Sequence, residues 1–323
     1  MTDVVAVDVG GTHARFALAT LEGGRVTHLS DEVVLKTAEH ASFETAWQAY
    51  AAVVSRPLPR SAGVAVACPV HGDVLQLTNN PWVIRPDAIA RSLRLEGLRF
   101  VNDFAAVAYA VAHAPTDNLQ HICGPDVPLP TSGVISLVGP GTGLGVAALH
   151  RTGEHAHVIS TEGGHTDFAP LDSVEDALLE RLRQRYRRVS AERVVAGPGL
   201  VEIHATLAAI EGRAIEPRED KELWRAALAG DDSLAVAALD RFCLSLGSVA
   251  GDIALTQGAA AVVIAGGLGL RLSEQLPRSG FAHRFTAKGR FEAMMARMPV
   301  KLLTHPQPGL LGAAAAFAQE HRQ

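Results

Sequence analysis

The chain has 323 residues, 48% of them hydrophobic and 20% charged, which is the balance of an ordinary globular protein large enough for two lobes. Its formal net charge of −5 and the lack of any long basic block argue against nucleic acid or an anionic membrane as a partner. No apolar run approaches the roughly 20 residues of a membrane span. The three cysteines show no CxxC spacing and no leader pattern precedes the first strand, so we expect a reduced, cytoplasmic protein without disulfide or zinc site.

A glycine-bearing turn joins the first two predicted strands. The buried run 4–7 leads into Asp8-Val9-Gly10-Gly11-Thr12, and an extended pattern resumes at Phe16. Dinucleotide-binding loops and P-loops open a helix instead, so this turn matches neither. We expect the backbone amides of this turn to hold a phosphate, with Asp8 facing it.

The next elements are mostly structural. Residues 41–54 form an amphipathic helix whose Trp47 faces the core, and 63–67 is a buried strand. A short strand, 74–77, leads into the polar loop 78–82, which is typical of a turn and less often of a cleft wall.

An amide and a carboxylate then end an apolar run. Residues 98–101 read as a strand, Asn102 and Asp103 follow it, and a helical pattern covers 104–113. One interpretation is that Asp103 caps this helix. The other places both side chains at the C-terminal mouth of a strand, where α/β proteins bind ligands.

The first pattern recurs about 130 residues later. Strand 134–138, the glycine turn 139–145 and the extended run 146–149 repeat the opening unit, which predicts a duplicated architecture of two similar lobes. An extended segment, 157–160, leads to Glu162-Gly163-Gly164-His165, whose glycines free the backbone for a tight turn.

Helices dominate the rest of the chain. Ser173 and Asp176 resemble a capping box for a helix reaching about residue 187, and helical patterns cover 200–256. Strand 261–265 ends in Gly266-Gly267, strand 300–303 follows, and the helix 308–319 could cross back onto the first lobe.

Three glycine turns after buried strands, with neither GxGxxG nor GK[ST], resemble the sugar-kinase, actin and chaperone-ATPase superfamily. Within it the chain resembles bacterial glucokinases of the non-ROK type over nearly its whole length. The motifs that carry this resemblance are 8–15, 67–70, 102–104, 141–145, 162–165, 190–193 and 308–312. One departure is His13, where the family frequently has Asn.

The resemblance implies two ribonuclease-H-like lobes, a small one of residues 1–105 plus 302–323 and a large one of 106–301, with a cleft that closes on sugar. It implies ATP-dependent phosphorylation of glucose at the 6-hydroxyl, with Asp103 as the base. The implied sugar ligands are Asn102, Asp103, Glu162, His165 and Glu192. The implied ATP-binding residues are Asp8, Gly10, Gly11, Thr12, Gly141, Thr142, Gly143, Gly266 and Gly267. Asp8 would also organise Mg²⁺ through water, and the enzyme would be a homodimer.

Two other functions fit the same fold. A non-catalytic, sugar-binding regulator would keep the lobes, but such proteins usually append a DNA-binding helix-turn-helix. An actin-like or chaperone-like ATPase would turn over ATP without sugar. From local sequence alone, Glu162 could equally be a turn residue and Glu192 a first-turn helix carboxylate.

Overall fold

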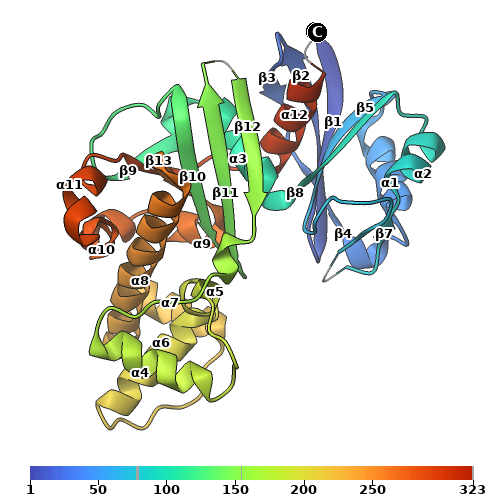
Figure 1. The fold of residues 1–323 in the computed structure, drawn as a ribbon. Helices are drawn as coiled ribbons and strands as arrows, with labels where there is room; N and C mark the ends of the chain where they lie inside the picture. Colours follow the sequence, from blue (N-terminus) through green and yellow to red (C-terminus); the bar gives the residue numbers. More distant parts are fainter. Residues whose placement is uncertain (78–79, 154, 322–323) are drawn as a thin grey trace. The chain divides into compact units, whose positions relative to one another are not determined.

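A computed structural model describes residues 1–77, 80–153 and 155–321, so Thr78 and Asn79 of the expected 78–82 loop lie outside the description. The chain forms two compact units, one of residues 1–115 and 305–323 and one of residues 116–304 (Figure 1). The boundaries therefore lie after residues 115 and 304 rather than after 105 and 301. The helix that follows Asn102 belongs to the first unit because it packs tightly on the C-terminal helix, and strand 300–303 pairs within the second unit.

The first unit is a mixed sheet flanked by helices. Its strands are β1 (Thr2–Val9), β2 (His13–Glu22), β3 (Arg25–Leu29), β4 (Val33–Lys36), β5 (Ser61–Val66), β6 (Leu75–Gln76), β7 (Val83–Ile84) and β8 (Gly97–Asn102). Its α-helices are α1 (Phe43–Val54), α2 (Pro86–Ser92), α3 (Asp103–His113) and α12 (Pro308–Glu320).

Strand order β3-β2-β1-β5-β8 decides which residues share an edge. β1 and β2 form the expected antiparallel hairpin, and β1, β5 and β8 run parallel. Asp8 is opposite Ala65, and the next residue of β5, Val66, is opposite Asn102. Because parallel strands end at the same edge, Asp8 and Asn102 lie at one edge of this sheet.

The two faces of this sheet are packed differently. Aromatic side chains from α1 cover one face, where Phe16 stacks on Tyr50 at 5.0 Å between ring centroids and Trp47 is 6% exposed, confirming the expected core position. On the other face, α12 and α3 approach so closely that a Cβ on Gly312 would lie 1.7 Å from the Ala106 carbonyl oxygen. This contact fixes the helix that begins at Asp103, and it confirms that the C-terminal helix returns to the first unit.

The second unit repeats the sheet and adds a helical layer. Its strands are β9 (Leu119–Cys123), β10 (Ser132–Pro140), β11 (Leu144–Thr152), β12 (His155–Thr161), β13 (Ala259–Ile264) and β14 (Val300–Leu303). Its α-helices are α4 (Ser173–Arg183), α5 (Ala191–Val195), α6 (Gly199–Ile210), α7 (Asp220–Ala229), α8 (Ser233–Gln257), α9 (Gly266–Arg271), α10 (Phe281–Thr286) and α11 (Glu292–Met295).

Strand order β12-β11-β10-β13-β14 matches the order in the first unit, with β9 added at the far edge. In both units an antiparallel hairpin is followed by parallel strands, so the predicted duplication is confirmed. Helices α4, α6 and α7 gather at one end of α8 in Figure 1.

Helix α8 is long and apolar enough to cross a membrane, although the sequence suggested no such run. Within the most apolar 18-residue stretch of α8, 72% is buried inside the protein. Since protein side chains already cover this surface, α8 is the central core helix of the second unit.

Helix α4 begins one residue away from the expected cap and ends earlier than expected. Asp172, rather than Ser173, is the N-cap, and its Oδ1 accepts hydrogen bonds from the Val174 and Glu175 amides, both at 3.1 Å. The helix ends at Arg183 and not near residue 187. The predicted capping box is wrong because an aspartate one position earlier provides the cap.

Candidate active site

Three consecutive carbonyl groups anchor the turn after β1. Asn80 Nδ2 donates to the Gly10 oxygen at 3.1 Å, the Thr37 hydroxyl donates to the Gly11 oxygen at 3.0 Å, and the Thr37 amide donates to the Thr12 oxygen at 3.0 Å. In a trans peptide the N–H points opposite to the C=O. The amides of Gly11, Thr12 and His13 therefore face away from these anchors, as a phosphate-binding turn requires.

Asp8 lies at the end of β1 in a crowded position. Its carboxylate is 3.8 Å from the Arg15 guanidinium, and its side chain is 24% exposed. Burial raises the pKa of Asp8 from 3.8 to about 6, the Arg15 charge opposes this rise, and the Asp103 and Glu32 charges add to it. A Cβ on Gly309, in the first turn of α12, would lie 2.5 Å from Asp8 Oδ2. Only glycine leaves room there for the carboxylate.

Asn102, and not Asp103, is the N-cap of α3. Asn102 Oδ1 accepts from the amides of Phe104 at 3.0 Å and Ala105 at 3.2 Å. Asn102 Nδ2 donates to the Cys68 carbonyl at 3.4 Å. Asp103 is the first helical residue, and its Oδ1 accepts from the Phe104 amide at 2.8 Å. The interpretation that Asp103 serves as the cap is wrong because Asn102 takes that position. The Asp103 charge also helps to raise the pKa of the Cys68 thiol, after burial.

In the second unit, Glu192 contacts the second glycine turn directly. Glu192 Oε2 accepts a 2.9 Å hydrogen bond from the Leu144 amide. A Cβ on Gly143 would lie 2.5 Å from the same oxygen, so a glycine is required at Gly143 for this approach. The turn is closed by a 2.8 Å bond from the Gly141 amide to the Gly143 oxygen. A carboxylate predicted to bind sugar thus contacts a loop predicted to bind phosphate.

The Glu162–His165 segment lies against the same strand. A Cβ on Gly164 would lie 2.2 Å from the Leu144 carbonyl oxygen, and one on Gly163 would lie 2.8 Å from Val146 Cγ1. Neither glycine has a positive φ. The expected tight turn forms, as a 3-10 turn over Gly163–His165, and the two glycines are required there for the close approach to β11.

Both predicted ligands on this segment face solvent. His165 Nε2 is 3.9 Å from Glu162 Oε2, and the side chains are 56% and 78% exposed. The Ala191 amide donates to the Thr166 oxygen at 2.8 Å, which connects the segment to α5 and Glu192. Glu192 and the 162–165 segment thus both approach Leu144, Glu192 through its carboxylate and the segment through Gly164.

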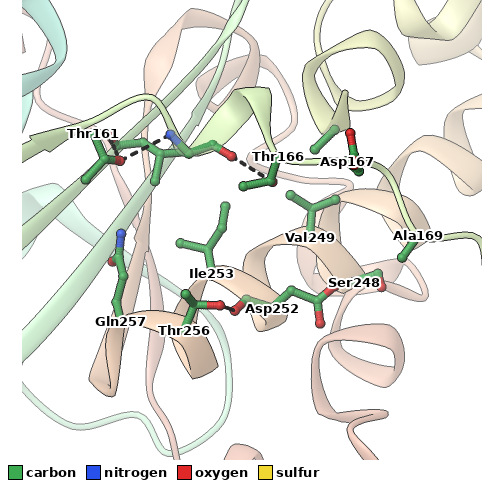
Figure 2. Close-up of a pocket in the computed structure, with 13 residues that line it drawn as sticks. Thr161, Thr166, Asp167, Ala169, Ser248, Val249, Asp252, Ile253, Thr256 and Gln257 are labelled. Carbon is green, nitrogen blue, oxygen red and sulfur yellow. Dashed lines mark hydrogen bonds between the residues drawn. The ribbon is translucent and has the colours of Figure 1, made fainter. Parts of the chain in front are cut away.

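A pocket of 450 Å³ lies behind this segment. Figure 2 shows Val249 and Ile253 of α8 extending toward the stretch that carries Thr161 and Thr166. Two hydrogen bonds within the 161–166 segment stabilise its turn. The Thr161 hydroxyl accepts from the Gly163 amide, and the Thr166 hydroxyl donates to the Gly163 oxygen at 2.9 Å. None of the predicted sugar ligands lines this pocket, so the pocket is distinct from the candidate site.

A second pocket, of 370 Å³, joins two predicted nucleotide loops. Gly141 and Thr142 line it from the β10–β11 turn, and Gly267 lines it from the start of α9. Gly266 has φ +82°, and a Cβ there would lie 2.8 Å from the Pro140 oxygen, so glycine is required on both grounds. The remaining lining residues were missed from the sequence because they carry no motif: Gly197, Pro198, Asp220, Lys221, Trp224, Leu268 and Arg271.

Within the described residues, no three His, Cys, Asp or Glu side chains cluster as an all-protein metal site. The oxygen donor of Asp8, with the Asp103 charge nearby, still suits Mg²⁺, which keeps several waters and binds through one or two carboxylates and substrate phosphates.

Comparison with known proteins agrees with this geometry. A family model described as Glucokinase matches residues 5–320. The glucokinase of Zymomonas mobilis subsp. mobilis is 58% identical over 321 residues, covering 99% of each chain. The crystal structure of glucokinase from an Antarctic psychrotroph has a TM-score of 0.88 at 32% identity and covers 98% of this chain and 99% of that chain.

A more distant structure shares the fold alone. The ROK family glucokinase from Streptomyces griseus, in complex with glucose and AMPPNP, has a TM-score of 0.60 at 19% identity, covering 97% of this chain and 98% of that chain. The expected actin-like ATPase fold is confirmed. Sequence, family model and fold agree along nearly the full length, and the chain belongs to the glucokinase family.

Proposed function

We propose that Asp103 is the base in the reaction that family membership assigns to this chain, the ATP-dependent phosphorylation of D-glucose at its 6-hydroxyl. The observation that carries this proposal is the division of roles at the start of α3. Asn102 caps the helix, and Asp103 stands beside it at the sheet edge that also carries Asp8. Family membership favours this kinase over the regulator and the sugar-independent ATPase.

The chemistry needs one carboxylate and good positioning. The 6-hydroxyl oxygen attacks the γ-phosphorus of ATP, the bond from that phosphorus to the β–γ bridging oxygen breaks, and ADP leaves. Asp103 accepts the hydroxyl proton as the new O–P bond forms. Phosphoryl transfer depends mainly on alignment and charge stabilisation, to which such a base adds.

The other roles divide between the two units. We propose that Asn102 together with Glu162, His165 and Glu192 binds the remaining sugar hydroxyls. Paired donors and acceptors suit a polyol because a buried polar group left unpaired costs about 1–3 kcal/mol. The phosphates would bind the two glycine turns, through the amides of Gly11, Thr12 and His13 in the first and those of Thr142 and Gly143 in the second. The amides of Gly10 and Gly141 instead close their own turns, onto the His13 and Gly143 oxygens. The nucleoside would bind beside Gly266 and Gly267.

Mg²⁺ would be held by Asp8 through water and would neutralise charge on the phosphates. The anchored carbonyls of Gly10, Gly11 and Thr12 support phosphate binding by the first glycine turn, because the amides that follow them, rather than the carbonyl oxygens, then face the phosphate.

Two further properties are part of the proposal. The three cysteines are free, which suits the reducing cytoplasm. A homodimer is proposed from the family resemblance, and light scattering on the purified protein would then give twice the 34.0 kDa of one chain.

The test of the base is an Asp103→Ala variant. Purified protein with ATP, Mg²⁺ and glucose should form ADP. Asp103→Ala should lose almost all of this activity while glucose binding stays measurable and thermal stability stays near wild type. Asp87→Ala, an exposed carboxylate in the first turn of α2, is the matched control and should stay active. Wild-type protein without glucose-dependent ADP formation, or an active Asp103→Ala variant, would contradict the proposal.

A further inference from the structure

One carboxylate in the second unit has a shielded oxygen without a partner. Asp220 is the first residue of α7, and its Oδ1 is buried without a hydrogen bond from any described residue. A buried carboxylate oxygen without a donor is costly, and such atoms in native proteins call for an explanation. Helix capping does not supply one, because Glu219 holds the N-cap position and Asp220 lies inside the helix.

The same residue lines the 370 Å³ pocket that Gly141, Thr142 and Gly267 also line. Rotation about the last side-chain torsion exchanges the two carboxylate oxygens, so either oxygen can serve a ligand in this pocket. A ligand that donates hydrogen bonds to the carboxylate from the pocket would offset the cost of the oxygen that stays shielded.

The distance of Asp220 from the phosphate turn indicates which part of a bound nucleotide its carboxylate would contact. A Cβ on Gly197 would lie 3.3 Å from the Gly141 oxygen and 3.5 Å from Asp220 Oδ2. Only the width of one glycine therefore separates the carboxylate from the turn proposed to bind phosphate. In ATP the ribose is the group attached directly to the phosphates, and the base is farther away.

The backbone around Asp220 is fixed. Trp224, one turn later on the same face of α7, donates from Nε1 to the Gly197 oxygen at 2.9 Å. The Gly197 amide in turn donates to the Gly141 oxygen at 2.8 Å. These two bonds hold α7 in register with the phosphate turn, so the carboxylate is positioned before any ligand binds.

We propose that Asp220 reads the ribose of the phosphoryl donor, accepting hydrogen bonds from its 2′- and 3′-hydroxyls, and so selects ribonucleotides over deoxyribonucleotides. A carboxylate is well suited to a vicinal diol because it has two acceptor oxygens and no donor. Acidic side chains bind ribose hydroxyls in the same chemical way in dinucleotide-binding folds. The inference rests on the proposed ATP-binding role of the two loops.

The test compares nucleotides in wild-type protein and in Asp220→Ala. Affinity is measured by calorimetry with AMPPNP, an ATP analogue, and with 2′-deoxyATP in the absence of glucose, so this readout does not need turnover. Specificity is measured as kcat/KM for ATP, 2′-deoxyATP, 3′-deoxyATP and inosine triphosphate, at saturating glucose.

Wild-type protein should prefer ATP over each deoxynucleotide by roughly ten-fold or more, since a hydrogen bond to a charged group contributes enough for that factor. Asp220→Ala should bind AMPPNP roughly ten-fold more weakly, and its preference for ATP over the deoxynucleotides should fall below about two-fold. Its KM for glucose and its ratio of ATP to inosine triphosphate should match wild type.

Glu219→Ala is the matched control, because it removes an exposed carboxylate one residue earlier in the same turn and should leave every ratio unchanged. An Asp220→Ala variant that keeps the ribose preference would overturn the inference, as would one that changes only the ratio of ATP to inosine triphosphate. A wild-type protein that binds AMPPNP with ribose selectivity but does not phosphorylate glucose would instead contradict the proposed function and leave the role of Asp220 standing.

Discussion

Glu192 Oε2 accepts a 2.9 Å hydrogen bond from the Leu144 amide, and this bond connects a predicted sugar ligand to a predicted phosphate turn within one unit. The Leu144 carbonyl oxygen is covered by Gly164, next to Glu162 and His165. Leu144 therefore contacts both Glu192 and the segment that carries Glu162 and His165. The Glu192 side chain, proposed to bind glucose, therefore also holds the backbone proposed to bind ATP.

Two substitutions of Glu192 should separate these roles. Glu192→Gln keeps an oxygen that can accept from the Leu144 amide, so KM for ATP should stay near wild type while KM for glucose rises. Glu192→Ala leaves the amide without its acceptor, and both KM values should rise, each by roughly ten-fold for a loss of about 1.4 kcal/mol. Steady-state kinetics with each substrate varied gives both values.

The control is Glu180→Gln, which changes an exposed carboxylate of α4 and should change neither KM. If Glu192→Ala raised KM for glucose alone, the hydrogen bond to Leu144 would have no role in nucleotide binding.

Asn102 has a structural role that can be separated from sugar binding. Asn102→Asp keeps the oxygen that caps α3 but loses the 3.4 Å hydrogen bond from Nδ2 to the Cys68 carbonyl, so it should lower the free energy of unfolding by about 0.5–1 kcal/mol. Because the Nδ2 donor is gone, KM for glucose should rise. Asn102→Ala removes the cap as well and should cost about 1 kcal/mol more.

Urea denaturation and glucose kinetics on the same preparations provide the measurements. Equal kinetics in wild type and Asn102→Asp would show that Asn102 serves the helix and not the sugar.

The sequence predicted the elements with strong patterns and missed contacts between distant segments. The two strand–turn–strand hairpins were predictable because glycines interrupt buried runs in the same way at Asp8–Thr12 and 139–145. The sequence left open whether Asp103 caps α3, because Asn102 and Asp103 are adjacent and both are good capping residues.

Partners far apart in sequence left no local pattern. Asp220 follows an unremarkable polar segment, and only the folded chain places it beside Gly197 and the phosphate turn. The reason for Gly163 and Gly164 was likewise hidden, because it lies in β11 and not in the turn itself.

Two glycines of α12 lie in close contact with other groups, Gly312 with the backbone of α3 and Gly309 with the side chain of Asp8. Gly312→Ala would place a methyl group 1.7 Å from the Ala106 backbone oxygen, so α3 and α12 would have to separate. We expect a loss of at least about 3 kcal/mol of stability, at the upper end of overpacking costs, or failure to fold. Thermal and urea denaturation measure it.

Gly309→Ala is the comparison within the same helix. Its methyl group would meet the Asp8 side chain at 2.5 Å, and a side chain can move where a backbone cannot. This variant should fold with a smaller loss of stability, but the displaced Asp8 should lower kcat/KM for ATP by roughly ten-fold or more. Gly312→Ala with wild-type stability would contradict the described packing of α3 on α12.

The pKa of Asp8 makes stability depend on pH in a defined direction. Burial raises the pKa of this carboxyl from 3.8 in the unfolded chain to about 6 in the folded one. Between these values the folded state binds more protons than the unfolded state, so the free energy of unfolding falls as pH rises from about 4 to about 6. The loss is complete by about pH 7 and amounts to about 3 kcal/mol at most, because each pKa unit corresponds to about 1.4 kcal/mol.

Asp8→Asn cannot ionise, so it should lack this dependence. Urea denaturation at several pH values between 4 and 7, with a chelator and without nucleotide, should show Asp8→Asn gaining stability relative to wild type as pH rises. Asp3→Asn, at the more exposed start of the same strand, is the control and should not reproduce that gain. A difference between Asp8→Asn and wild type that stayed constant, or that shrank with rising pH, would show that Asp8 ionises normally in the folded protein. Such a gain would mean that the buried, ionised Asp8 carboxylate destabilises the folded protein at neutral pH. The same carboxylate lies at the end of β1, where Mg²⁺ would be held through water.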